Sequence, residues 1–147
     1  MGKNIKINNN WLKMPVEIYR LNVFICINQS RKEVEDFGEK SGIQTWRFDN
    51  EWTMKFNNAY NMSSGFVLLF GEGESNRNLL LWLKNRPSHI GYDGVLYHEL
   101  YHVVEWIANA VDPSSRLCDE DGHSEARAYL FQYLVNKAHD FFWSNEK

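Results

Sequence analysis

Apolar and polar residues alternate in the first half of the chain with the two-residue period of β-strands. Residues 21–27 (LNVFICI) place apolar side chains at every second position and are rich in β-branched residues, which favours a strand. Residues 66–70 form a second short apolar run. Residues 78–85 (NLLLWLKN) fit a strand or a short helix, and we predict an edge strand that precedes a long helix.

Residues 43–56 contain another alternating pattern on both sides of a possible tight turn, Asp49-Asn50. This pattern predicts a β-hairpin. We expect its tryptophans to pack in a core rather than bind a ligand, because aromatic residues dominate core burial. The alternating residues are Trp46 and Phe48 before the turn and Trp52, Met54 and Phe56 after it.

Three segments have helical spacing instead. Residues 31–40 follow a capping Ser30, and residues 94–111 follow a possible cap at Asp93 and end before a proline. A last helix is predicted from Ser124 to Phe142. With residues 1–10 as a loose lead-in, the order β-α-β-β-β-β-α-α predicts one α+β domain over residues 1–147.

Composition excludes several classes of protein. The chain has 147 residues, of which 44% are hydrophobic, enough for a compact domain with its own core. A net charge of −3 excludes strong nonspecific binding to nucleic acid. No segment has the ~18 consecutive apolar residues of a membrane span, and the first ten residues lack the apolar core of an export signal.

Two cysteines are too few for a disulfide framework, so we expect a cytoplasmic protein. Cys26 lies within an apolar strand pattern and is expected to be buried. Cys118 lies in a polar segment near the candidate site described next, where a metal ligand or a redox thiol is conceivable.

The motif HELYH places two histidines four residues apart in the helix predicted for residues 94–111. At this spacing, His98 and His102 project from one helix face and can reach a single tetrahedral zinc ion. Glu99, beside them, can accept a proton from a metal-bound water and pass it to a leaving amine. The alternative is an ordinary amphipathic helix with two histidines. Glu105, one turn beyond His102, either orients a ligand or lies on the surface.

The other face of this helix carries an apolar stripe at three- and four-residue steps. We expect the stripe to pack against the sheet, while the histidine face borders a cleft. The stripe consists of Leu96, Leu100, Val103, Ile107 and Val111.

A catalytic zinc usually has three protein ligands, and the third is expected near residues 118–136. Glu125 opens the last helix and is the preferred candidate, with His123 as its competitor. Tyr129 lies one turn after Glu125 and could hydrogen-bond its carboxylate or stabilise an oxyanion, or it could be a core aromatic. His123 could instead assist the oxyanion. Asp119, Glu120 and Asp121 are further options, although acidic residues near a helix start are usually solvated.

The motif HELYH followed by EARAYLFQYL resembles the zincin metallopeptidases, specifically those whose third ligand is a glutamate. It is similar to the small ImmA/IrrE-type peptidases and to compact HExxH proteins of phages and mobile elements. The resemblance covers residues 89–136 and implies a small mixed sheet lying on the active-site helix. The chain lacks both a C-terminal lobe and the longer HExxHxxGxxH motif of some zincins.

The sequence thus predicts a small zinc-dependent metallopeptidase that hydrolyses a peptide bond in a peptide or protein substrate. His98, His102 and Glu125 are the expected metal ligands, Glu99 is the expected base and acid, and Tyr129 or His123 the expected helper. The alternative is a zincin-fold binding or interaction module of phage or mobile-element origin that performs no turnover.

Overall fold

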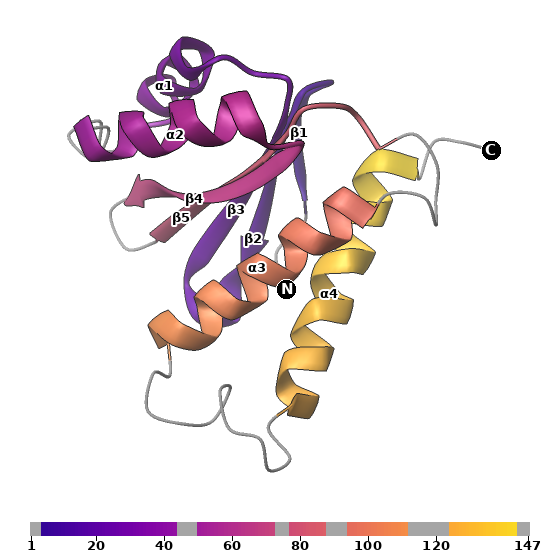
Figure 1. Cartoon of the computed structure of the whole chain (residues 1–147). Helices are drawn as coiled ribbons and strands as arrows, with labels where there is room; N and C mark the ends of the chain where they lie inside the picture. The colour runs from indigo at the N-terminus through magenta and orange to yellow at the C-terminus, as the bar shows by residue number, and fades with distance from the viewer. Residues whose placement is uncertain (1–3, 44–49, 73–76, 88–93, 112–123, 144–147) are drawn as a thin grey trace. The chain divides into compact units, whose positions relative to one another are not determined.

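In a computed structural model, the residues described form a mixed five-stranded sheet and four α-helices (Figure 1). The structure describes residues 4–43, 50–72, 77–87, 94–111 and 124–143. The α+β class predicted from the sequence is therefore confirmed. The single domain predicted over residues 1–147 contains two compact units, Met1–Arg86 with the sheet and Pro87–Lys147 with a pair of helices.

The sheet has the strand order β1-β2-β3-β5-β4. Neighbouring strands are antiparallel except for β3 and β5, which are parallel. The strands predicted around residues 21–27, 66–70 and 78–85 are present, but β5 lies inside the sheet rather than at its edge. The bounds are β1 Ile5–Asn8, β2 Trp11–Val16, β3 Leu21–Ile27, β4 Gly65–Glu72 and β5 Arg77–Leu83.

Strand β1 occupies part of the segment that the sequence suggested was a loose lead-in. The strand has only four residues, all of them exposed, so its alternation of Ile5 and Ile7 with polar residues is too short to identify a strand from the sequence. Its pairing with β2 places Ile5 opposite Lys13. A short turn, η1 (Glu17–Tyr19), then connects β2 to β3.

The parallel pair β3–β5 joins strands that are far apart in the sequence, with Leu21 aligned to Arg77 and Ile27 to Leu83. A buried side-chain hydrogen bond marks this register: Asn22 Nδ2 donates to Asn78 Oδ1 at 3.2 Å. Because a one-residue slip would separate these two amides and leave them buried without each other, the bond favours the observed alignment.

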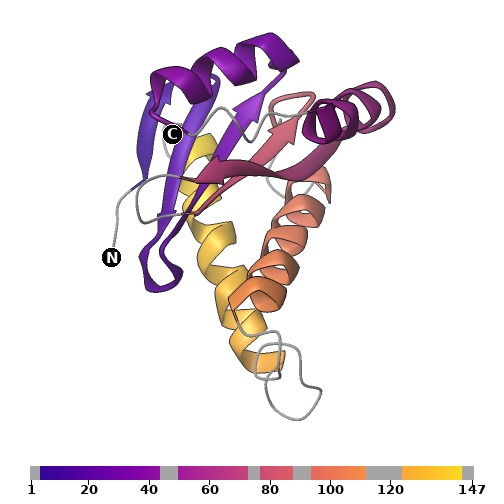
Figure 2. The same cartoon turned by 90° about the vertical axis from the view of Figure 1, so that its left-hand side faces the viewer.

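Helices α1 (Arg31–Lys40) and α2 (Asn50–Met62) lie on the same face of the sheet (Figure 2). Helix α1 begins as predicted at Ser30, whose hydroxyl accepts from the Glu33 N–H at 3.2 Å while the Glu33 carboxylate accepts from the Ser30 N–H at 3.1 Å. This reciprocal capping box satisfies two N–H groups at the helix start.

The hairpin predicted for residues 43–56 is wrong, because residues 50–62 form α2; residues 44–49 lie outside the described residues. Trp52 and Phe56 are four residues apart, so they share one helix face as readily as one strand face. Both are buried, whereas Met54 between them is 58% exposed, as a helix requires. An ion pair between Glu51 and Lys55, 3.2 Å apart, also has helical spacing.

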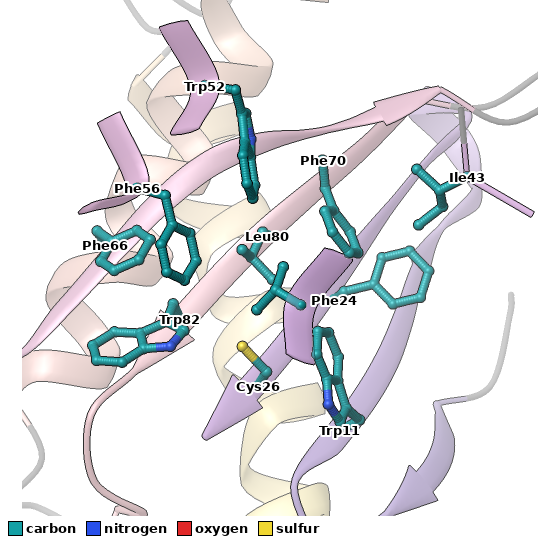
Figure 3. Packing of buried hydrophobic residues seen from close by; sticks show 11 residues of the cluster. Trp11, Phe24, Cys26, Ile43, Trp52, Phe56, Phe66, Phe70, Leu80 and Trp82 are labelled. Carbon is teal, nitrogen blue, oxygen red and sulfur yellow. The ribbon is translucent and has the colours of Figure 1, made fainter. Parts of the chain in front are cut away.

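Aromatic residues fill the space between the sheet and these two helices (Figure 3). The Trp52 indole N–H donates to the Leu69 carbonyl and the Trp82 N–H to the Gln29 carbonyl, both at 2.7 Å. The expectation that Trp52 belongs to the core is confirmed, and Trp46 lies outside the described residues. Cys26 is also fully buried as expected, and burial raises the pKa of its thiol.

The second unit consists of α3 (Gly94–Val111) and α4 (Ser124–Trp143), which run antiparallel (Figure 1). The hydroxyl of Tyr97 lies 3.0 Å from Nε2 of His139, and the ring of Tyr101 meets Phe131 edge-on, with centroids 6.0 Å apart. Both predicted helices are thus present. The predicted cap Asp93 lies outside the described residues. None of the described helices is long and apolar enough to cross a membrane.

Candidate metal centre

The two histidines of HELYH lie together on the exposed face of α3. One helical turn separates His98 from His102, so their rings lie one above the other. Their Nε2 atoms are 3.0 Å apart and the rings meet edge-on with centroids 4.6 Å apart. The structure therefore brings the two predicted ligands to one point.

The distance between these nitrogens suits a shared metal ion. Two imidazole nitrogens bound to one tetrahedral zinc at 2.0–2.1 Å are about 3.3 Å apart. The observed separation of 3.0 Å would have to widen by only about 0.3 Å to meet that geometry. In the metal-free protein, the same contact requires one ring to donate and the other to accept.

Glu105 lies against the second histidine, where its carboxylate can accept a hydrogen bond from a protonated Nδ1 of His102. Its Oε1 is 3.3 Å from Nδ1 of His102, and the two side chains are 44% and 48% exposed. An ion pair this exposed contributes little stability. A proton held on Nδ1, however, leaves the Nε2 lone pair free to bind a metal. Of the two roles considered for Glu105, the contact supports the orienting one.

Glu99 differs from its histidine neighbours because it is only 6% exposed. Burial raises the pKa of its carboxyl, while the nearby imidazoles of His102 and His98 lower it to a smaller extent. Glu99 has no hydrogen-bond partner among the residues described. A partly desolvated carboxylate with a raised pKa is a stronger base than an exposed one, which suits proton transfer near neutral pH.

The face of α3 that carries the apolar stripe is buried. The apolar stripe predicted from the sequence is buried at every position that the structure describes, and the side chain of Val111 lies outside the described residues. The histidines lie on the opposite side. The stripe residues with no exposed area are Leu96, Leu100, Val103 and Ile107.

Helix α4 lies on the flank of α3 away from Glu99. Successive helix residues are about 100° apart, so Glu99 lies to one side of His98 and Tyr97 to the other. Tyr97 and Tyr101, on that second side, both contact α4. A third ligand supplied by α4 would therefore approach the histidines without competing with Glu99 for space.

Glu125, the preferred third ligand, lies in the first turn of α4, and its side chain is not among those described. It precedes Phe131 by six residues, about 9 Å along the helix axis. Since the helices are antiparallel and Phe131 contacts Tyr101, this displacement is in the direction of His102 rather than His98. The assignment of Glu125 stays a prediction.

Tyr129 is described and is 65% exposed, so the core-aromatic interpretation of this residue is wrong. Its hydroxyl is available to solvent or to a bound molecule. Among the described residues, no group of three His, Cys, Asp or Glu side chains is placed to hold a metal ion. The remaining candidates lie outside the described residues: Cys118, Asp119, Glu120, Asp121 and His123.

The hydrogen bond between Tyr97 and His139 was not expected from the sequence. His139 also packs edge-on against Trp143, with centroids 4.5 Å apart. A useful indication was available: Tyr97 and Tyr101 are four residues apart and form a stripe directly beside the histidine face. That stripe marks the side of α3 on which α4 lies.

In comparisons with protein-family models, curated proteins and solved structures, nothing matches this chain.

Proposed function

We propose that the protein is a small zinc-dependent metallopeptidase with a zincin-like fold, in which His98, His102 and Glu125 bind the metal. The observation that carries this proposal is the convergence of two exposed imidazole Nε2 atoms at 3.0 Å, directly beside a buried carboxylate. A surface helix with no chemical role has no reason to bury Glu99 next to two solvent-exposed bases.

Each residue would have a distinct task. When bound, a zinc ion would supply a water of lowered pKa and polarise the scissile carbonyl. Glu99 would take the proton of the attacking water and return it to the leaving amine. The contact of Glu105 with Nδ1 would hold the His102 ring in the tautomer that presents Nε2. Tyr129 or His123 would donate a hydrogen bond to the developing oxyanion.

Because this chemistry hydrolyses a peptide bond, we expect the substrate to be a peptide or a protein. The proposed location is cytoplasmic, in line with the sequence analysis. A glutamate ligand from α4 is preferred over His123 because α4 approaches the free flank of the histidine pair. These assignments rest on the site and on the resemblance of its motif to zincins, since a fold alone does not determine function.

The first test is the metal content of full-length protein purified without chelators or metal-affinity resin. Elemental analysis and native mass spectrometry should find one zinc per chain, lost in His98→Ala and His102→Ala and retained in Glu99→Gln. His139→Ala is the matched control, because its ring is bonded to Tyr97 on the other flank. Comparison of Glu125→Ala with His123→Ala identifies the third ligand.

The second test uses denatured casein as the probe and detects new peptides by mass spectrometry. Glu99→Gln should lower the cleavage rate by about 10²- to 10⁴-fold, the contribution typical of a general base. Protein that contains no zinc and takes up none on addition would overturn the metal site. Zinc bound with casein left intact would instead favour the alternative, a zincin-fold binding module without turnover.

A further inference from the structure

The sheet unit contains a cavity of about 560 Å³ between helix α1 and the start of the chain. Its lining comes entirely from residues 7–41, so it is a feature of this unit alone and separate from the histidine face of α3. Its volume falls in the range of pockets that bind small molecules or side chains. The proposed peptidase chemistry gives this cavity no role.

Apolar side chains form one wall of the cavity. The rings of Trp11 and Phe37 are stacked with centroids 3.7 Å apart, and Ile7 from β1 lies beside them. Ile7 is 42% exposed, so its side chain is accessible to a bound molecule. Because Trp11 is only 3% exposed and its ring is stacked on Phe37, this wall suits the aliphatic stem of a long side chain rather than its charged head.

The lining of the cavity contains more acidic than basic side chains. Glu33 and Asp36 lie one turn apart on α1, and Lys40 follows one turn later. Glu33 uses Oε1 in the capping box, which leaves its second oxygen free for a ligand. Asp36 has only a loose contact with Lys32, 3.6 Å away and 82% exposed. Two carboxylates against one ammonium favour a cationic ligand.

Gln29 provides a polar group deep in the lining, since it is only 9% exposed. Its Oε1 accepts from the Trp11 indole N–H at 2.9 Å, and its Nε2 donates to the Ile27 carbonyl at 3.1 Å. These two bonds fix the orientation of the amide. They leave one amide hydrogen with no partner in the part of the chain that is described, and a carbonyl oxygen of a ligand would satisfy it.

Strand β1 borders the cavity and lies at the edge of the described sheet, where it pairs only with β2. The backbone N–H and C=O groups on its outer side can pair with an added strand. The cavity therefore combines an edge for an extended backbone, an amide donor for a carbonyl and an acidic, aromatic pocket for a side chain.

The geometry points to a binding site for an extended peptide segment that carries a lysine or arginine side chain. The stem of this side chain lies along Trp11 and Phe37, and its charged head reaches Glu33 and Asp36. This inference does not depend on the proposed metallopeptidase activity, because none of the lining residues belongs to α3 or α4.

The test is an NMR titration of ¹⁵N-labelled full-length Glu99→Gln protein, a background that leaves an added peptide uncut. The probe is acetyl-Thr-Val-Lys-Val-Thr-amide, compared with the same peptide containing norleucine, which has the stem of lysine without the charge. We expect the lysine peptide to shift the Trp11 indole and Gln29 amide resonances. It should bind about tenfold more tightly than the norleucine peptide, as expected for one charge-assisted contact.

Substitutions in α1 test the charges directly. The Glu33→Gln and Asp36→Asn double variant keeps a capping side chain at position 33 and should reduce binding of the lysine peptide to the norleucine level. The matched control, Glu35→Gln with Glu39→Gln, makes the same change in net charge on α1 outside the cavity and should bind like the parent. Lys40→Met should increase affinity for the lysine peptide by roughly twofold.

Two outcomes would overturn the inference. Equal binding of the lysine and norleucine peptides to the parent protein would remove the role of the carboxylates, and this comparison needs no variant to fold. No shift of the Trp11 indole at about 5 mM peptide would exclude even a millimolar site.

Discussion

The buried indoles and the Asn22–Asn78 pair of the sheet unit are hydrogen-bonded, whereas the buried carboxylate of Glu99 in the helix pair is not bonded to any described residue. In the sheet unit, the buried Trp11, Trp52 and Trp82 indoles each donate to an acceptor at 2.7–2.9 Å, and Asn22 is bonded to Asn78. In the helix pair, a buried carboxylate lies beside two exposed imidazoles without a hydrogen-bond partner among the described residues. Satisfied polar groups stabilise a fold, whereas unsatisfied titratable ones are typical of sites that react or bind.

The largest expected effect tests whether stability depends on the aromatic core. Phe56→Ala removes a side chain with no exposed area and should lower the free energy of unfolding by about 3–5 kcal/mol. Met54→Ala is the matched control, because this residue is on the same helix and 58% exposed. Chemical denaturation monitored by tryptophan fluorescence measures both.

The corresponding test in the helix pair replaces both His98 and His102 by alanine and measures the free energy of unfolding of the metal-free protein. The double substitution should change the free energy of unfolding by less than about 0.5 kcal/mol, because both side chains are exposed. A loss as large as that of Phe56→Ala would contradict the division between a stabilising unit and a reactive one.

A second substitution tests whether Glu105 contributes to the metal site. Glu105→Gln should weaken zinc affinity by about 10- to 100-fold, since residues that orient a metal-binding histidine typically have effects of this size. Competition with a chromogenic chelator measures the affinity. Glu51→Gln, which breaks a comparable helical ion pair with Lys55 in the other unit, should leave it unchanged. Equal affinities for the parent and Glu105→Gln would show that the contact with His102 is only a surface pair.

A smaller effect is expected at the start of α1. Ser30→Ala removes the hydroxyl that accepts the Glu33 N–H and should cost about 1 kcal/mol of stability. Ser64→Ala, an exposed serine before β4, should have almost none. Thermal unfolding of the two variants compares them, and identical midpoints would mean that the capping box does not stabilise the sheet unit.

The smallest predicted effect concerns the Cys26 thiol. Burial holds its pKa above the ordinary value of 9.0, so the folded state keeps its proton while the unfolded state loses it as the pH rises. Stability should therefore fall with pH, by about 0.4 kcal/mol at pH 9 relative to neutral pH. The measurement compares Cys26→Ala with its parent, both in a Cys118→Ser background. Parallel curves between pH 7 and 9 would contradict a raised thiol pKa.

Local patterns predicted the helices of the candidate site, while its assembly depended on distant residues. The bounds of α3 and the pairing of His98 with His102 follow from helical spacing and the proline after residue 112, both readable from adjacent residues. The alignment of α4 along α3 was not readable from the sequence, since helix periodicity does not encode the register between two helices. The observed register depends on contacts such as Tyr97 with His139, which are 42 residues apart.

The failures in the sheet unit have a similar physical cause. The segment at Trp52 and Phe56 fits both periods, because a spacing of four residues satisfies a strand and a helix equally. The helical spacing of Glu51 and Lys55 distinguishes the two structures, but only weakly on its own. Strand β1 escaped detection because its alternation, Ile5 and Ile7 among polar residues, spans only four residues and is too short to identify a strand.

The order of strands in the sheet has a consequence for folding. Strand β5 is the last strand in the sequence, yet it lies between β3 and β4. A nascent chain that ends before residue 77 contains β1 to β4 but not β5, so the apolar strand β3 at the end of the meander β1–β2–β3 has an unpaired edge and β4 lacks its partner. Such edges promote aggregation, and pairing between distant strands is slow because long loops must close first. Arrival of β5 closes the sheet, so the chain is most vulnerable to self-association until residues 77–83, just past the middle of the 147-residue chain, have been synthesised.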